Sequence, residues 1–143
     1  MRLFLDACTL IYRFEGAALF RDATTALIAQ LTAGQDTVEL AVSRLSVMEC
    51  RVKPLREGDA RLLQRYADFF AAVQVIDLSA AVLDMATHVR AHHGLKTPDA
   101  LQAACALEWQ QQTPQAPEVL FITADQGFLR VPTLQARLIA VPA

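Results

Sequence analysis

Asparagine does not occur in this chain of 143 residues, which excludes the Asn-X-Ser/Thr acceptor site of N-glycosylation. Cysteine is scarce and odd in number, and no two of Cys8, Cys50 and Cys105 have the spacing of a CxxC pair. A disulfide framework or a zinc knuckle is therefore not expected. Each cysteine stands among apolar residues, so we expect reduced thiols packed in the core of a cytoplasmic protein.

Long apolar runs are also missing. No uncharged stretch approaches the roughly 20 residues of a membrane-spanning helix, and Asp6 interrupts the first apolar run too early for a signal peptide. Gly and Pro number only 5 and 6, while 54% of residues are hydrophobic, which excludes a disordered or collagen-like chain. We expect one soluble domain over residues 1–143, without membrane contact.

The chain has no large excess of positive or negative charge. Thirteen Lys and Arg residues stand against 15 Asp and Glu residues, which gives a formal net charge of -2. This balance excludes a polycation that coats nucleic acid, although a local basic patch is compatible with it.

Short apolar runs that alternate with helical stretches predict the fold. Strands are expected over 2–5, 38–42, 73–78, 119–123 and 137–141. Helices are expected over about 17–33, 44–52, 60–72, 80–92 and 98–112, with one more helix between the first strand and residue 17. We expect Lys53-Pro54 to end the helix over 44–52, followed by a polar link over 55–58, and Thr97 to cap the helix that follows it. The predicted class is α/β: a three-layer α/β/α sandwich around a central, mostly parallel sheet of four to five strands.

Four carboxylates stand where such a sheet would bring side chains together. Asp6 ends the first strand, and Asp125 follows the fourth. Asp99 lies in the first turn of the helix after the Lys-Thr-Pro turn, and Glu49 interrupts the mostly apolar helix after the second strand. Because ligands of an open parallel sheet bind beyond the carboxyl ends of the strands, we expect these acids to meet at that edge.

Each acid also has a purely structural explanation. Asp6 can cap the first helix, Asp99 can interact with its helix dipole, and Asp125 can stabilise a turn. Glu49 is harder to explain in this way, because an unpaired buried carboxylate is costly. An ion pair with a nearby Arg is the alternative for this residue.

Taken together, the four acids favour a metal centre. Converging carboxylates raise one another's pKa values, and a divalent cation removes that cost. An all-oxygen ligand set suits Mg²⁺ or Mn²⁺ rather than zinc. Such an ion can polarise a phosphodiester and activate water, so the predicted reaction is phosphodiester hydrolysis.

The segments around these acids resemble a known family. FLDACTLIY at 4–12, SRLSVMEC at 43–50, LKTPDALQAACAL at 95–107 and FITADQGF at 121–128 resemble the four acidic motifs of PIN-domain ribonucleases. The compact length and the third of these segments resemble the VapC-like toxins of type II toxin–antitoxin modules.

The resemblance implies a PIN-like fold and Mg²⁺- or Mn²⁺-dependent cleavage of RNA. It implies that the catalytic and metal-binding residues are Asp6, Glu49, Asp99 and Asp125. Asp6 and Asp99 would be the direct ligands, with Thr123 as a polar neighbour. It also implies a homodimer and a cognate antitoxin whose tail blocks the site.

Cys8 departs from the family, which often has Asn at this position, so the local hydrogen-bond network is expected to differ. The same residue counts against a phosphatase of the haloacid-dehalogenase type, which needs a second Asp there. A non-catalytic module that binds metal or a partner on the same fold remains an alternative. Basic residues near Glu49 can contact RNA phosphates or form a solvated face, namely Arg44, Arg51, Lys53 and Arg56.

Overall fold

The apolar run RLFL forms β1 (Arg2–Leu5), which is buried at all four positions and is the central strand of a five-stranded sheet. The computed structural model describes residues 1–140. The strand order is β3-β2-β1-β4-β5, with β2 (Glu39–Ser43), β3 (Gln74–Ile76), β4 (Val119–Thr123) and β5 (Gln135–Leu138). Every neighbouring pair of strands is parallel, as predicted.

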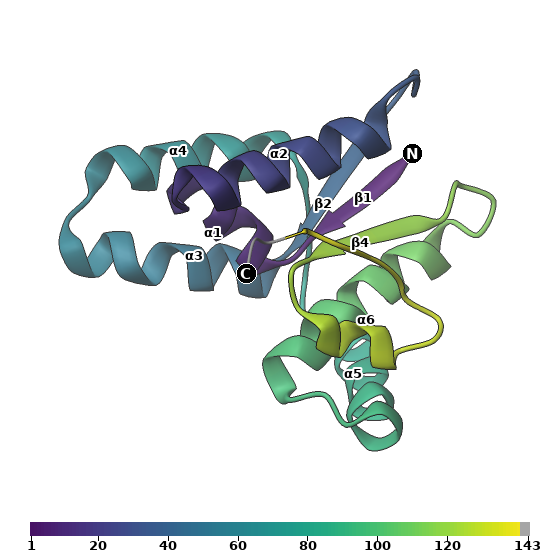
Figure 1. Ribbon diagram of the computed structural model, residues 1–143. Coiled ribbons are helices and arrows are strands. Elements are labelled where there is room, and N and C mark those ends of the chain that lie inside the picture. The colour runs from purple at the N-terminus through teal and green to yellow at the C-terminus, as the bar shows by residue number, and fades with distance from the viewer. Residues whose placement is uncertain (141–143) are drawn as a thin grey trace.

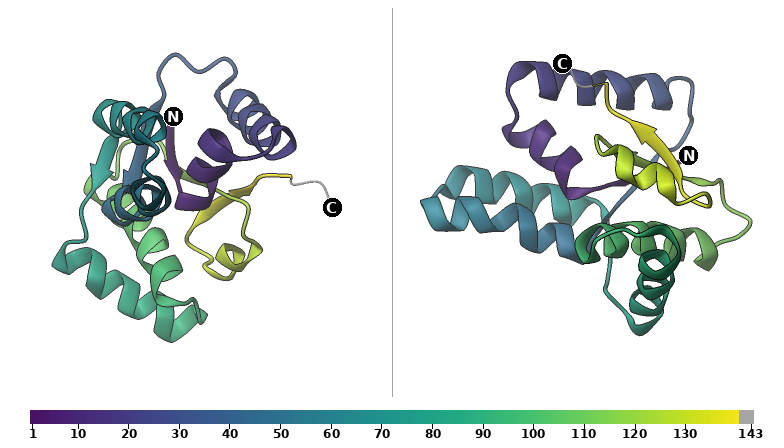
Figure 2. Two further views of the ribbon diagram at one scale, coloured as in Figure 1. Left: turned by 90° about the vertical axis from the view of Figure 1, so that its left-hand side faces the viewer. Right: turned by 60° about the horizontal axis from the view of Figure 1, so that its bottom comes forward.

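Helices cover both faces of this sheet (Figures 1 and 2). One apolar cluster joins β1 to α1 (Ala7–Glu15), α2 (Ala18–Thr32), α3 (Arg44–Glu57) and α4 (Ala60–Ala72). A second cluster joins the opposite face to α5 (Ala80–His93), α6 (Thr97–Gln112) and the short 3-10 helix η1 (Gln126–Arg130). This confirms the predicted α/β/α sandwich. None of the helices in residues 1–140 is both long and apolar enough to cross a membrane.

The order of the strands places a crevice between β1 and β4. From β1 the chain moves outward through β2 and β3, and it then returns to add β4 and β5 on the other side of β1. The connections from β1 and β4 therefore leave the carboxyl edge of the sheet in opposite directions, which is the place where open α/β sheets bind ligands. Asp6 follows β1 directly, and Asp125 follows β4 by two residues.

The prediction that Lys53-Pro54 ends the third helix is wrong. α3 continues to Glu57, so most of the predicted polar link over 55–58 is helical. The helix ends at Gly58, which has a φ of 67° and donates its N–H to the carbonyls of Leu55 and Pro54. Pro54 is tolerated because it lies in the last turn, where it removes one intrahelical hydrogen bond, and because its ring is buried.

Two other predicted boundaries need correction. α6 begins at Thr97 with Lys96 as its N-cap, and the Thr97 hydroxyl accepts a hydrogen bond from Arg90 instead of capping the helix. β5 covers Gln135–Leu138 rather than 137–141, because its pairing with β4 begins at the polar Gln135. Residue 141 of the predicted strand lies outside the described residues. The remaining predicted bounds agree with the structure to within two residues.

Arg2 is a buried cation at the start of the central strand, with an exposed fraction of 3%. Its Nε donates to the carbonyl of Pro117 at 2.7 Å, and a terminal nitrogen donates to the carbonyl of Trp109 at 3.1 Å. The guanidinium carbon also lies 5.2 Å from the centroid of the Trp109 ring. The cation thus ties β1 to the last turn of α6, where positive charge is favourable, and to the loop that leads into β4.

We expect Arg2→Met to lower the free energy of unfolding by about 2–4 kcal/mol, because it leaves buried carbonyl oxygens without a donor. Urea unfolding followed by circular dichroism measures the change. Arg21→Met, at an exposed position of α2, is the control and should change stability by about 0.5 kcal/mol or less. Equal stability of the two variants would contradict the role assigned to Arg2.

Candidate active site

Asp6 is held at the carboxyl end of β1 by two threonines. Its Oδ1 accepts the backbone N–H of Thr9 at 2.8 Å and lies 2.7 Å from the Thr9 hydroxyl. Its Oδ2 accepts the hydroxyl of Thr123 at 2.6 Å. Asp6 is therefore the N-cap of α1, as its structural explanation proposed, and it is also only 4% exposed. The helix cap fixes the carboxylate at the edge of the sheet rather than excluding it from a site.

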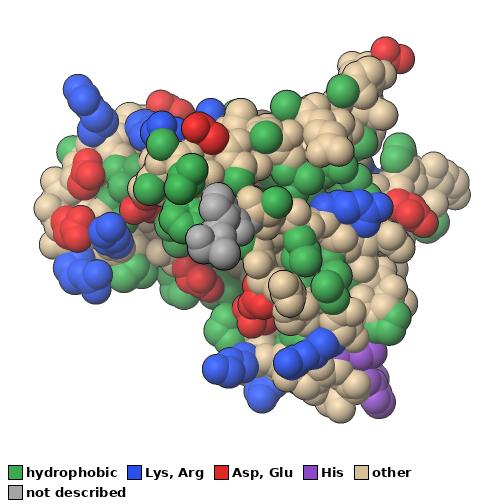
Figure 3. All heavy atoms as spheres, viewed as in Figure 1, with side chains coloured by type: hydrophobic (Ala, Val, Ile, Leu, Met, Phe, Trp, Pro, Cys, Tyr) green, Lys and Arg blue, Asp and Glu red, His purple; other side chains and the backbone are tan. Residues whose placement is uncertain are grey.

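The structure brings all four predicted acids to one cavity of about 190 Å³. Each acid comes from a different element: Asp6 from the end of β1, Glu49 from α3, Asp99 from the first turn of α6, and Asp125 from the N-cap of η1. The lining also includes Ala7, Cys8, Pro98, Gln102 and Phe128. Acidic side chains are visible near the middle of the face in Figure 3, with Lys and Arg side chains below them.

Asp125 also makes the turn that the sequence suggested. Its Oδ1 accepts the backbone N–H of Gly127 at 2.7 Å and so caps η1. A Cβ atom at Gly127 would lie only 3.0 Å from this oxygen, so glycine allows the close approach. The turn leaves the Asp125 carboxylate exposed at the cavity.

Burial and mutual repulsion raise the pKa values of three of these carboxyl groups. Burial has the largest effect on the pKa of Asp6, against which the hydrogen bonds from Thr123 and Thr9 act. Burial raises the pKa of Glu49 first, and the charges of Asp99 and Asp6 add to this. For Asp99, burial and the charge of Asp125 raise the pKa, while Lys96 opposes them.

The hydroxyl of Thr9 also connects Asp6 to the neighbouring strand. It lies 2.7 Å from Asp6 Oδ1 and 2.8 Å from the carbonyl oxygen of Ile122 in β4. The side chain that holds the carboxylate is therefore itself anchored to the sheet.

Glu49 is not neutralised by the ion pair that its structural explanation required. No ion pair within 4.0 Å in residues 1–140 includes Glu49. Arg44 pairs with Asp77 at 2.9 Å, and Lys53 lies 3.9 Å from Glu15. The half-buried carboxylate of Glu49 therefore faces the other acids without a basic partner.

The donors at this cavity fit a hydrated Mg²⁺ or Mn²⁺ ion better than a closed metal cage. The carboxylates offer only hard oxygen ligands. Within the described residues, however, no three His, Cys, Asp or Glu side chains are close enough to hold one ion together. Mg²⁺ is commonly bound through one or two carboxylates and keeps several waters, so this spacing is compatible with it.

Residues that the sequence analysis did not single out complete the site. Thr9 holds Asp6, and its position three residues after a capping acid is a signal that could have indicated it. Gln102 is 4% exposed and lines the cavity; it is the polar member of a run of buried apolar residues in α6, one turn after Asp99. The prediction of core packing is confirmed for Cys50 and Cys105 but is wrong for Cys8, which lines the cavity.

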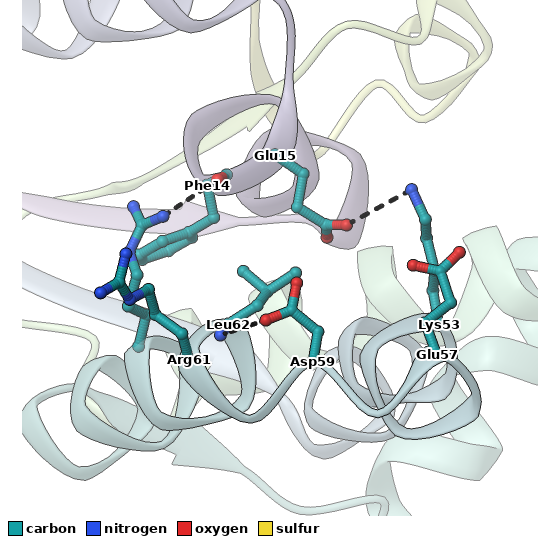
Figure 4. Close-up of a pocket in the computed structure, with 8 residues that line it drawn as sticks. Phe14, Glu15, Lys53, Glu57, Asp59, Arg61 and Leu62 are labelled. Atoms are coloured by element: carbon teal, nitrogen blue, oxygen red, sulfur yellow. Dashed lines mark hydrogen bonds and ion pairs between the residues drawn. The ribbon is translucent and has the colours of Figure 1, made fainter.

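A larger cavity of about 310 Å³ lies between the end of α1 and the α3–α4 hairpin (Figure 4). Two of its carboxylates already have partners: Lys53 lies 3.9 Å from Glu15, and Asp59 accepts the backbone N–H of Leu62 at 3.0 Å. Its lining contains three acidic and three basic side chains, so no single charge accumulates there. We therefore assign the chemistry to the smaller acidic cavity.

Fold and cavity together define a parallel α/β domain with an acidic site where the strand order reverses. The family model of the PIN domain matches residues 3–134. The chain therefore belongs to the PIN-domain family. No curated protein sequence matches the chain significantly.

Solved structures with the same fold cover nearly the whole chain. VapBC2 from Rickettsia felis, bound to a DNA fragment from its promoter, has a TM-score of 0.72 at 18% identity, covering 96% of this chain and 98% of that chain. VapBC-1 from nontypeable Haemophilus influenzae has a TM-score of 0.69 at 15% identity, with coverages of 96% and 98%. A toxin–antitoxin complex from Klebsiella pneumoniae has a TM-score of 0.67 at 21% identity, with coverages of 92% and 94%.

We expect Asp99→Asn to raise the midpoint temperature of the metal-free protein at pH 7 by about 1–3 °C. The pKa of Asp99 is higher in the folded protein than in the unfolded chain, so the folded state binds its proton more tightly. The contribution of protonated Asp99 to the free energy of unfolding is fully present at acid pH. It is lost as the pH rises through the pKa of Asp99 in the folded protein. At neutral pH the remaining charge is unfavourable, and Asn removes it.

Differential scanning fluorimetry with and without Mg²⁺ tests this expectation. Mg²⁺ should raise the midpoint of the parent protein more than that of Asp99→Asn. Asp84→Asn, at an exposed position of α5, serves as the control and should respond as the parent does. A metal-free Asp99→Asn protein that is less stable than the parent at pH 7 would contradict the electrostatic account.

Proposed function

We propose that this protein is a Mg²⁺- or Mn²⁺-dependent endoribonuclease and the toxin of a toxin–antitoxin pair. The observation that carries the proposal is the meeting of four carboxylates in one cavity, at the crevice between β1 and β4, with raised pKa values for Asp6, Glu49 and Asp99. Membership of the PIN-domain family supports it, because PIN domains are generally nucleases that need a divalent metal. We place the activity in the cytoplasm.

In this proposal Asp6 and Asp99 would hold the ion, and the ion would supply positive charge for the phosphate oxygens and for the activation of water. Thr9 and Thr123 keep the Asp6 carboxylate in one orientation. Glu49 and Asp125 border the same cavity and can orient the attacking water and accept its proton. Pro98 and Phe128 supply apolar lining beside the acids.

The proposed partners are RNA, a cognate antitoxin and a second copy of the chain. The solved structures with this fold are toxin–antitoxin complexes, which supports an antitoxin partner. Support for a homodimer comes from α3, where Met48, Val52 and Leu55 are 55%, 51% and 63% exposed at helical spacing. Lys96 lies close enough to Asp99 to affect its pKa and is suited to contact a phosphate of the RNA.

A non-catalytic binding module on the same fold is the second candidate. It is favoured by the finding that no three metal-ligating side chains of residues 1–140 come close enough together to hold an ion. Such a module would bind its partner without metal-dependent cleavage of RNA, so an activity assay separates the two candidates.

Asp99→Asn should reduce RNA cleavage by about 100-fold or more while the protein stays folded, because one carboxylate of the ion-binding pair is lost. The assay follows fragment formation from a mixture of cellular RNAs in Mg²⁺, and Asp84→Asn is the control.

EDTA should stop cleavage by the parent, and Mn²⁺ should restore it. Full activity in EDTA would remove the metal mechanism.

Expression of the chain without a neighbouring antitoxin gene should slow bacterial growth, and Asp99→Asn should relieve this effect. Growth curves after induction, with immunoblots to match protein levels, measure it. Co-expression of the adjacent reading frame should restore growth and allow copurification of its product. Normal growth with ample folded parent protein would count against a toxin.

A further inference from the structure

Gln102 takes part in a closed ring of buried hydrogen bonds beside the acidic cavity. Its Nε2 donates to the hydroxyl of Ser46 at 2.8 Å, and its Oε1 accepts the hydroxyl of Ser43 at 3.0 Å. The two serine oxygens lie 3.2 Å apart, which closes the ring. Ser43 and Ser46 are fully buried, and Gln102 is 4% exposed.

This ring joins helices that lie on opposite faces of the sheet. Ser43 is the last residue of β2 and the N-cap of α3, and Ser46 lies in the first turn of α3. Gln102 belongs to α6, which packs in the other apolar layer. The sheet separates the two layers, so the relative position of α3 and α6 depends on contacts that pass beyond its edge, such as this ring.

Each helix carries one of the acids a single turn away from the ring. On α3, Glu49 comes three residues after Ser46. On α6, Asp99 comes three residues before Gln102. Residues three apart in a helix share a face, and both acids line the cavity that Gln102 also lines. The hydrogen bond between Gln102 and Ser46 therefore lies next to the gap between Glu49 and Asp99.

The polarity of Gln102 is not needed to fill space. Its neighbours in α6 include Ala103 and Ala104, which are fully buried, and an apolar side chain of the same length would pack without the cost of burying an amide. The amide is instead matched by partners with good geometry on two other elements. A directional contact of this kind fixes a distance, whereas apolar packing tolerates small shifts.

We propose that Gln102 is a positioning residue, which through Ser43 and Ser46 holds α3 and α6 at the separation that keeps Glu49 beside Asp6 and Asp99, the proposed ligands of the metal ion. The inference rests on the proposed function, because it assigns a purpose to the gap between these acids. Gln102 does not need to touch the ion or the RNA for this role.

The test replaces Gln102 by Met, which keeps the length of the side chain and removes its donor and acceptor. Binding of Mn²⁺ alone is measured by electron paramagnetic resonance at a temperature where circular dichroism shows every variant to be folded. We expect the dissociation constant for Mn²⁺ to rise about 10- to 100-fold, and RNA cleavage to fall by a similar factor. Ser46→Ala breaks the ring from the α3 side and should have the same effect.

The double variant Ser46→Ala/Gln102→Met should lose no more Mn²⁺ affinity than either single variant. Each single variant already breaks the hydrogen-bond ring, so the second change has nothing further to remove. Gln110→Met is the matched control on α6; its side chain accepts the N–H of Val119 at 3.3 Å and does not line the acidic cavity. This control should bind Mn²⁺ as tightly as the parent, even where its stability changes.

Parent-like Mn²⁺ affinity in folded Gln102→Met overturns the positioning role, whatever happens to its stability. Additive losses in the double variant, or an equal loss in Gln110→Met, overturn it as well, since they indicate a general loosening of α6. If the parent protein and Gln102→Met bind Mn²⁺ and cut RNA equally well, the positioning role fails but the proposed function is still supported. A parent that neither binds Mn²⁺ nor cuts RNA refutes the proposed function itself.

Discussion

The placement of one carboxylate, that of Asp6, is the constraint on which the rest of the site depends. β1 is buried along its whole length, so the residue that follows it begins at the boundary between core and crevice. Thr9 and Thr123 occupy both oxygens of Asp6, and Thr123 belongs to the neighbouring strand β4. Pairing of β1 with β4 thus sets both the position of the acid and the donors that keep it there. The other acids of the cavity therefore surround a carboxylate whose orientation is fixed.

The same acids that would bind a metal ion lower the stability of the fold. Burial and mutual repulsion make the charged forms of Asp6, Glu49 and Asp99 unfavourable in the metal-free protein, as their raised pKa values show. The surrounding scaffold tolerates this because its other polar groups are satisfied: in the described part of the chain, no buried side-chain nitrogen or oxygen lacks a hydrogen-bond partner. A bound cation would offset the repulsion between these carboxylates. The cluster of acids that lowers the stability of the protein without metal would therefore raise its stability when metal is bound.

The site is assembled from both faces of the sheet. α1 and α3 belong to one apolar layer and α6 to the other, and their ends meet beyond the carboxyl edge of β1, β2 and β4. Solved structures that share 14–21% identity with this chain keep the fold over nearly its full length. Conservation of the overall fold does not by itself determine the sub-ångström spacing of side chains at such a junction. In this chain the buried amide of Gln102 supplies a directional contact there.

The sequence alone determined the layers and the identity of the acids. Alternating apolar runs and helical stretches encode a parallel sheet, and the position of an acid just after a strand or at the start of a helix depends only on local order along the chain. It did not reveal that α3 continues through Pro54, because the burial of that ring is a tertiary contact. The carbonyl partners of Arg2 are 107 or more residues away in the sequence, and the serine hydroxyl partners of Gln102 are 56 or more residues away. Only the tertiary structure decided these contacts, because a buried polar group is specified by the donors and acceptors that the folded chain brings to it and not by its own neighbours in sequence.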